Sequence, residues 1–123
     1  MAKPKVLHVD DEPDVLDLVR HILEKEGMDV ISVESGEECL KKLKAGKVDL
    51  VLLDIMMPNM SGWEVLKEIH QRHKGTRVIF LTVVRVNKAV LKDLIADGLT
   101  DYIQKPCSNE EIVRRVKKAL GMK

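Results

Sequence analysis

Several side chains able to take part in chemistry stand at the ends of short apolar runs. They are Asp10, Asp11, Asp54, Thr82 and Lys105. An acid after a strand is commonly the N-cap of the following helix, so each one alone has an ordinary structural explanation. As a set they are harder to explain in that way, because the carboxyl ends of parallel strands meet at one edge of a sheet, where α/β proteins bind their ligands. We therefore expect three carboxylates, a hydroxyl and an ammonium group to share one pocket.

A pocket with three carboxylates needs a counter-charge. The acids repel one another unless a cation neutralises them or one of them takes up a proton. Oxygen ligands without His or Cys favour a hard cation, and Mg²⁺, or Mn²⁺ in its place, suits a few carboxylates that share the ion with water and phosphate oxygens. A carboxylate beside such an ion and a lysine can attack phosphorus and form an acyl phosphate. This set of residues favours phosphoryl chemistry, with the hydroxyl of Thr82 as a hydrogen-bond donor to the transferred group.

The elements that must position these side chains alternate between two kinds of apolar pattern. Short runs rich in Val, Ile and Leu are typical of parallel strands covered on both faces, and they fall at residues 6–9, 30–33, 50–53, 78–81 and 102–103. Amphipathic stripes indicate helices, at residues 15–23, 40–43, 65–69, 90–95 and 112–120. Asn87 and Ser108 are expected to cap the last two helices. The pattern predicts an α/β fold, (βα)₅, with a doubly wound five-stranded parallel sheet.

Length and composition describe one ordinary domain. The 123 residues hold 21 Lys and Arg against 20 Asp and Glu, a formal net charge of +1, which argues against a bulk nucleic-acid or membrane binder. No linker or low-complexity segment interrupts the pattern, so we expect a single domain over residues 1–123 with no output domain. No signal-peptide pattern and no run of ~20 apolar residues is present, which favours a cytoplasmic protein with reduced cysteines at Cys39 and Cys107.

Four segments carry a resemblance to a known family. They read VLHVDDEP (6–13), LLDIMMPNMSGWEVL (52–66), FLT (80–82) and DYIQKP (101–106). In this order, at strand ends, they resemble the receiver domain of two-component response regulators. The chain is also similar in size to the stand-alone chemotaxis regulator. The resemblance runs from about Lys5 to Leu120. It implies a flavodoxin-like sheet with strand order 2-1-3-4-5 and a phosphoacceptor that takes its phosphoryl group from a sensor histidine kinase or a phosphotransfer protein in a phosphorelay.

The resemblance also implies roles for the residues of the pocket. Asp54 would be the phosphoacceptor, and Asp10 and Asp11 would bind Mg²⁺ together with Asp54 and the backbone carbonyl of Met56. Lys105 would pair with the phosphoryl group. Its peptide bond to the following proline, Pro106, is expected to be cis. Such a protein catalyses only its own phosphorylation and dephosphorylation.

A switch pair and a structural loop are implied in the same way. Phosphorylation would pull the hydroxyl of Thr82 inward and leave space into which the ring of Tyr102 turns. That movement would repack the face made by the fourth helix, the fifth strand and the fifth helix, where a downstream protein partner or a second copy would bind. Pro58 and Gly62 would shape the loop after the acceptor. No direct contact with nucleic acid or membrane is expected.

Some positions depart from the usual family pattern. Val83 follows Thr82 where the family commonly carries a small residue, so access to Asp54 is expected to be narrower. Met56 and Val84 lie two residues beyond Asp54 and Thr82, at positions that modulate dephosphorylation in the family. Because their apolar side chains cannot orient an attacking water, we expect slow loss of phosphate.

Two other classes of protein with this architecture find less support. A phosphatase of the haloacid dehalogenase type needs a second acid two residues after its nucleophile, where Met56 stands. A flavin-binding flavodoxin needs a hydroxyl- and glycine-rich loop after the first strand, where residues 10–13 read DDEP. His8, inside an apolar run, is expected to be a hydrogen-bonded core or edge histidine and not a phosphodonor.

Overall fold

Ten elements alternate between strand and helix through residues 3–123, which the computed structural model describes. Their bounds are β1 Lys5–Val9, α1 Pro13–Glu24, β2 Asp29–Val33, α2 Gly36–Ala45, β3 Leu50–Leu53, α3 Gly62–Arg72, β4 Arg77–Thr82, α4 Lys88–Ala96, β5 Asp101–Gln104 and α5 Asn109–Leu120. Every predicted strand and helix is confirmed, and each observed element contains the predicted run. The added residues lie at element ends, where apolar periodicity carries little information.

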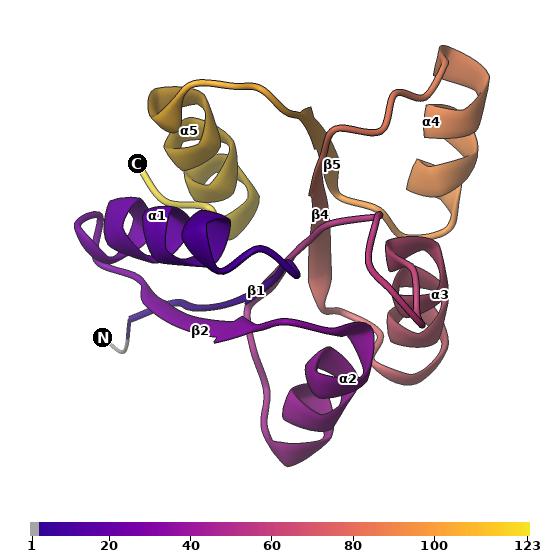
Figure 1. Ribbon diagram of the computed structural model, residues 1–123, viewed down its shortest axis with the longest axis horizontal. Helices are drawn as coiled ribbons and strands as arrows, with labels where there is room; N and C mark the ends of the chain where they lie inside the picture. Colours follow the sequence, from indigo (N-terminus) through magenta and orange to yellow (C-terminus); the bar gives the residue numbers. More distant parts are fainter. Residues whose placement is uncertain (1–2) are drawn as a thin grey trace.

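The five strands form one parallel sheet in the order β2-β1-β3-β4-β5, which confirms the expected topology. Figure 1 shows the strong twist of this sheet through the centre of the molecule. Val9 at the end of β1 pairs with Leu53 at the end of β3, and Leu53 pairs in turn with Phe80 of β4. The residues that follow these three strands are therefore brought to one edge, where the order of the strands reverses.

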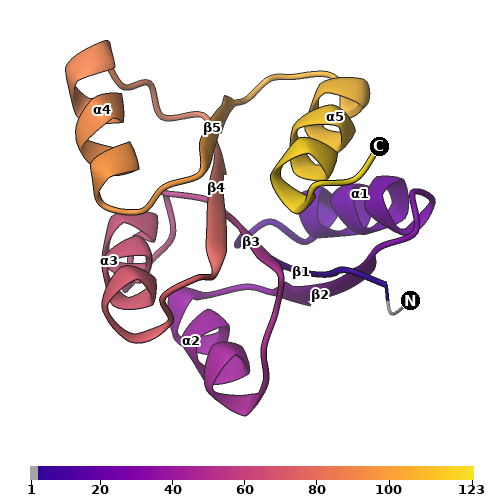
Figure 2. The ribbon, with the colours of Figure 1, turned by 180° about the vertical axis from the view of Figure 1, so that it is seen from behind.

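Helices cover both faces of the sheet, as the apolar runs predicted. Figures 1 and 2 show α1 and α5 on one face and α2, α3 and α4 on the other. Within β3, Leu50 and Leu52 belong to the core under α1 and α5, whereas Val51 and Leu53 belong to the core on the other side. All four side chains are fully buried. A strand buried on both faces reads as a continuous apolar run, since no position faces water.

Side-chain caps define where four helices begin. The side chains of Ser35, Ser61, Asn87 and Ser108 each accept a hydrogen bond from the backbone N–H three residues later. The two predicted caps, Asn87 and Ser108, are confirmed. These bonds satisfy N–H groups that have no partner within the helix, and each stabilises the helix by about 1 kcal/mol.

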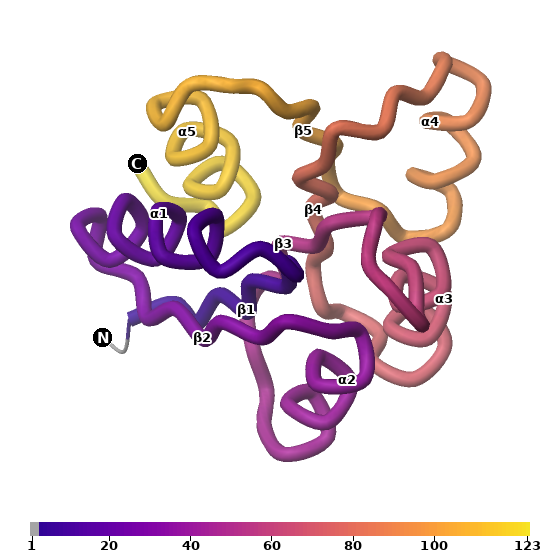
Figure 3. The backbone as a smooth tube through the Cα atoms, in the orientation of Figure 1, coloured from indigo at the N-terminus to yellow at the C-terminus, as the bar shows by residue number. Residues whose placement is uncertain are grey.

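The last helix returns to the first. Figure 3 shows α5 lying beside α1, and Nζ of Lys117 lies 2.5 Å from a carboxylate oxygen of Glu26.

Cys39 and Cys107 are both free. None of the helices within residues 3–123 is long and apolar enough to cross a membrane.

Candidate functional site

Three carboxylates meet at the carboxyl edge of β1 and β3. One oxygen from each of Asp10, Asp11 and Asp54 lies within 4.8 Å of the other two. Asp10 and Asp54 are buried, and Asp11 is exposed. The backbone N–H of Asp54 donates to the carbonyl of Val9 at 3.0 Å, so the strand pairing that aligns β1 with β3 also places the acids side by side.

Asp54 is held by contacts on both carboxylate oxygens. Its Oδ1 accepts a hydrogen bond from the backbone N–H of Met56 at 3.2 Å, and its Oδ2 lies 3.9 Å from Nζ of Lys105. Burial raises the pKa of Asp54 above its ordinary value, while a hydrogen bond from Thr82 and the charge of Lys105 oppose that rise. The negative charge of Asp10 raises the pKa further. The carboxylate is thus kept in a site where a cation is strongly favoured.

Lys105 brings the positive charge of the pocket. Its peptide bond to Pro106 is cis, as expected, and its backbone N–H donates to the carbonyl of Thr82 at 2.8 Å. Its Nζ lies 3.1 Å from Oδ2 of Asp10. The ammonium group therefore stands between two of the three acids.

Thr82 and Tyr102 contact the same peptide segment. The fully buried Thr82 accepts a hydrogen bond from the backbone N–H of Val84 at 3.3 Å. The hydroxyl of Tyr102 donates to the carbonyl of that same residue. The sequence suggested the pair but not this connection, because a backbone group shows no side-chain signal. Val84 is therefore a site residue that sequence reasoning saw only as an apolar side chain.

Aromatic contacts extend from Tyr102 across β4. Its ring lies edge-on to Phe80 with the centroids 6.1 Å apart, and Phe80 lies edge-on to Trp63 with the centroids 5.6 Å apart. Trp63 is partly exposed at the start of α3. Tyr102, Phe80 and Trp63, the chain's three aromatic residues, thus form one row from β5 across β4 to the start of α3.

The loop after Asp54 requires glycine at position 62. A Cβ there would lie 2.5 Å from the carbonyl oxygen of Asp54 and 2.7 Å from Cα of Ile55. The backbone N–H of Gly62 donates to the carbonyl of Ile55 at 2.8 Å, which closes the loop. Pro58 is exposed within this loop, and its carbonyl accepts from the N–H of Met60 at 2.8 Å.

His8 does not match the expectation of a hydrogen-bonded histidine. Its side chain is buried, and its Nδ1 has no hydrogen-bond partner among the described residues. Burial, with the nearby charge of Lys105, lowers the pKa of His8 to about 3. Val6, on the same face of β1, packs in the apolar layer under α1 and α5, so Nδ1 of His8 meets no polar group there.

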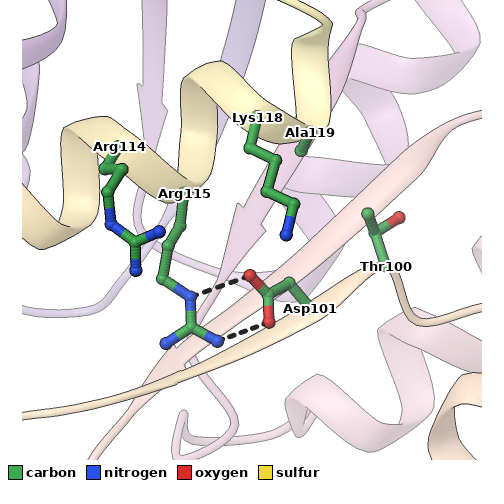
Figure 4. A pocket seen from close by; sticks show the side chains of 6 residues that line it. All are labelled: Thr100, Asp101, Arg114, Arg115, Lys118 and Ala119. Atoms are coloured by element: carbon green, nitrogen blue, oxygen red, sulfur yellow. Dashed lines mark hydrogen bonds and ion pairs between the residues drawn. The ribbon is translucent and has the colours of Figure 1, made fainter.

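A polar hollow of about 570 Å³ lies apart from the acidic pocket, between β5 and α5. Figure 4 shows Arg115 reaching Asp101 with two hydrogen bonds, of 2.9 and 2.6 Å, with Lys118 beside them. These bonds fix the outer surface of β5 against α5. The hollow is lined by residues of α5, by the first residue of β5 and by Thr100 just before it.

Fold and site together define a class: a five-stranded α/β domain with a cluster of acids, a lysine and a buried threonine at the carboxyl edge of its sheet. The chain belongs to the response regulator receiver domain family, whose sequence model matches residues 6–117. It is therefore a receiver domain of two-component signalling.

Curated relatives are transcriptional regulators. The chain is 40% identical over 118 residues to the alkaline phosphatase synthesis transcriptional regulatory protein PhoP of Bacillus subtilis, covering 94% of this chain and 48% of that protein. It is 38% identical to the transcriptional regulatory protein CpxR of Escherichia coli, covering 94% of this chain and 49% of CpxR. The chain thus spans about half the length of these relatives.

Solved structures show the same fold. The response regulator TrrA of Thermotoga maritima, in complex with Mg²⁺ and BeF, matches with a TM-score of 0.83 and 38% identity, covering 95% of this chain and 99% of that one. The signal receiver domain of a LuxO repressor protein from Vibrio parahaemolyticus matches with a TM-score of 0.89 and 29% identity, covering 97% and 91%.

Proposed function

We propose that Asp54 is the phosphoacceptor of this receiver domain and takes its phosphoryl group from the phosphohistidine of a sensor kinase or a phosphotransfer protein. One observation carries the proposal: three carboxylates and Lys105 meet at the point of the sheet where the strand order reverses. Among the three acids, Asp54 accepts from the loop N–H of Met56 and lies within reach of Lys105.

The donor set fits Mg²⁺, or Mn²⁺ in its place. The carboxylates of Asp10, Asp11 and Asp54 offer oxygen atoms only, within 4.8 Å of one another, as hard divalent cations require. The backbone carbonyl of Met56, next to Asp54 in the loop, would add a further oxygen. When bound, the ion supplies positive charge that neutralises phosphoryl oxygens.

The transfer itself is carried by the chain's own residues. An oxygen of Asp54 attacks phosphorus, the bond from phosphorus to the histidine nitrogen breaks, and its electron pair stays on the imidazole. The ammonium group of Lys105 offsets the negative charge of the transferred group, and the hydroxyl of Thr82 donates a hydrogen bond to it. The chain in this proposal catalyses only its own phosphorylation and dephosphorylation.

Output follows from the same threonine. When Thr82 turns toward the phosphoryl group, it gives up its bond with the N–H of Val84, and Tyr102 shares that residue through its carbonyl. The segment after β4 and the ring of Tyr102 therefore move together. This changes the surface of α4, β5 and α5, where we place the downstream protein partner or a second copy of the chain.

The receiver itself is proposed to signal through proteins, with no direct contact with nucleic acid. The net charge of +1 supports this, because binding a phosphate backbone needs a basic excess. We place the reaction in the cytoplasm, since bacterial transcriptional regulators such as the curated relatives act there.

Phosphorylation with a small-molecule donor tests the proposal. The protein is incubated with Mg²⁺ and acetyl phosphate and its intact mass is measured. We expect a gain of one phosphoryl group that is lost in Asp54→Asn and retained in Asp14→Asn, a matched change at an exposed acid of α1. No adduct from acetyl phosphate or from a panel of phosphorylated kinases, or an adduct that persists in Asp54→Asn, would contradict the assignment.

A further inference from the structure

The edge of the sheet opposite the acidic pocket carries a dense group of cations. Seven of the 21 lysines and arginines fall in residues 41–47 and 72–77, and neither segment contains an acid. The first segment ends α2 and leads toward β3, and the second ends α3 and leads into β4. Both turns lie at the amino ends of their strands, in the lower half of Figure 1. We call this surface, formed by residues 41–48 and 70–78, the basic edge.

Two grooves meet at the basic edge. The first, of about 360 Å³, lies between the two turns, with Leu43 and Val48 as buried floor and the exposed cations Lys44, Lys47 and Lys74 around it. The turn at residues 73–76 separates it from a second groove of about 410 Å³. That groove is lined by the buried side chains Leu66, Ile69 and Val78 and by the exposed Arg77. The surface therefore combines apolar floors with a positive rim.

The cations of this rim have no carboxylate partner among the described residues. The ion pairs found within residues 3–123 are made by other lysines and arginines, and none includes Lys44, Lys47, Lys74 or Arg77. The acids nearest in sequence are already engaged, since Asp49 accepts the backbone N–H of Lys5 and Glu68 pairs with Arg72. A helix C-terminus favours cations in its last turn, which accounts for Lys44 in α2. Lys47, Lys74 and Arg77 come after their helices have ended.

We propose that the basic edge binds an acidic peptide segment of a partner protein. The apolar side chains of that segment enter the two grooves. Charge complementarity calls for an acidic occupant. The apolar floors give specificity for side chains, whereas a nucleic-acid backbone would leave them unused. The site goes beyond the phosphoacceptor function, and it lies at the other end of the strands, so that a partner there leaves Asp54 accessible.

A second copy of this chain is the main competing occupant. Seven of the 20 acids lie in residues 10–14 and 34–38, which contain no cation, at the carboxyl edge of the sheet. That acidic edge is complementary in charge to the basic edge. If the acidic edge of one copy docked on the basic edge of another, it would cover the pocket of Asp54. Because the two surfaces differ, this contact would also build an open chain of molecules. A separate acidic partner avoids both consequences.

An NMR titration of the whole chain tests the proposal. The probe is a synthetic peptide of about ten residues, mostly glutamate with two leucines, long enough to span two neighbouring grooves. We expect amide shifts in residues 43–48 and 73–78, little change in residues 10–14, and binding that weakens with salt. The double variant Lys47→Glu with Lys74→Glu should lower the affinity about tenfold or more, since two favourable charge contacts become repulsive. Lys25→Glu with Lys92→Glu, the same charge change at exposed lysines elsewhere, should leave it within about twofold.

Several results of the binding experiments would overturn the proposal. They are absence of binding, binding that the Lys47→Glu and Lys74→Glu variant does not weaken, equal binding of a probe with serine in place of leucine, and equal binding of a DNA duplex of matched charge. Self-association in sedimentation that the double variant abolishes would assign the surface to a second copy instead. Phosphorylation by acetyl phosphate should be the same in that variant and the parent, so a failure here is distinguishable from a failure at Asp54.

Discussion

Nζ of Lys105 lies 3.1 Å from Oδ2 of Asp10 but 3.9 Å from Oδ2 of Asp54. The lysine is thus paired more closely with an acid proposed to bind the metal than with the proposed phosphoacceptor. Its positive charge offsets part of the repulsion among the carboxylates. A divalent cation on Asp10 would free the ammonium group for the phosphoryl group.

Removing the lysine should destabilise the fold when divalent cations are absent. We expect Lys105→Met to lower the free energy of unfolding by about 2–3 kcal/mol, because the buried carboxylate of Asp10 loses its partner. Added Mg²⁺ should restore part of that loss. Urea denaturation with and without Mg²⁺ measures both effects. Lys92→Met, at an exposed lysine of α4, should change stability by less than about 0.5 kcal/mol. Equal stability of Lys105→Met and the parent would show that the pair contributes nothing.

The protein should become less stable as the pH is lowered, because of His8. Its folded pKa is about 3, whereas the ordinary value is 6.5, so between these two values the unfolded chain binds one more proton at this residue. Stability therefore decreases as the pH falls through that window, by about 2 kcal/mol between roughly pH 7 and 5 for this group alone.

The variant His8→Leu isolates that contribution. The substitution removes the titrating group and the unpartnered Nδ1 from an apolar layer. The variant should therefore lose less stability than the parent when the pH is lowered from roughly 7 to 5. Urea denaturation at both values gives the comparison, with His21→Leu at an exposed position of α1 as the control. A parallel loss of stability in His8→Leu and the parent would contradict the buried neutral state.

The hydroxyl of Tyr102 should contribute to stability but not to phosphoryl transfer. Tyr102→Phe keeps the ring against Phe80 and loses the hydrogen bond to the carbonyl of Val84. We expect unfolding to become easier by about 1 kcal/mol, the usual net value of one hydrogen bond. The yield of phosphorylated protein with acetyl phosphate should be unchanged. A strong drop in yield would show that Tyr102 takes part in the chemistry, against the proposed division of roles.

Loss of the phosphoryl group should be slow. Met56 is 62% exposed beside Asp54, and Val84 lies half-buried next to Thr82. Neither side chain has a polar group to orient a hydrolytic water, so we expect a half-life longer than roughly one minute in Mg²⁺ buffer. Met56→Asn should shorten it, whereas Ile95→Asn on α4 should not. Intact mass measured over time after removal of the donor gives these rates, and a parent half-life of seconds would contradict the argument.

Local sequence signals account for most of the fold. The continuous apolar runs identified all five strands, since β3 and its neighbours are covered on both faces. Caps such as Asn87 and Ser108 were readable because a helix start needs a nearby oxygen acceptor. The acids at the ends of β1 and β3 were readable as a group because parallel strands place their carboxyl ends at one edge.

Only the tertiary structure decided which groups touch. The bond from Tyr102 to Val84 joins a side chain to a backbone carbonyl, which no residue type announces. The unpartnered Nδ1 of His8 depends on what packs over β1, and the basic edge depends on two turns that are distant in sequence. Periodicity and capping act over a few residues, so the sequence by itself determined the elements and the candidate chemistry. Contacts between elements depend on strand order and packing, and these determined the geometry of the site.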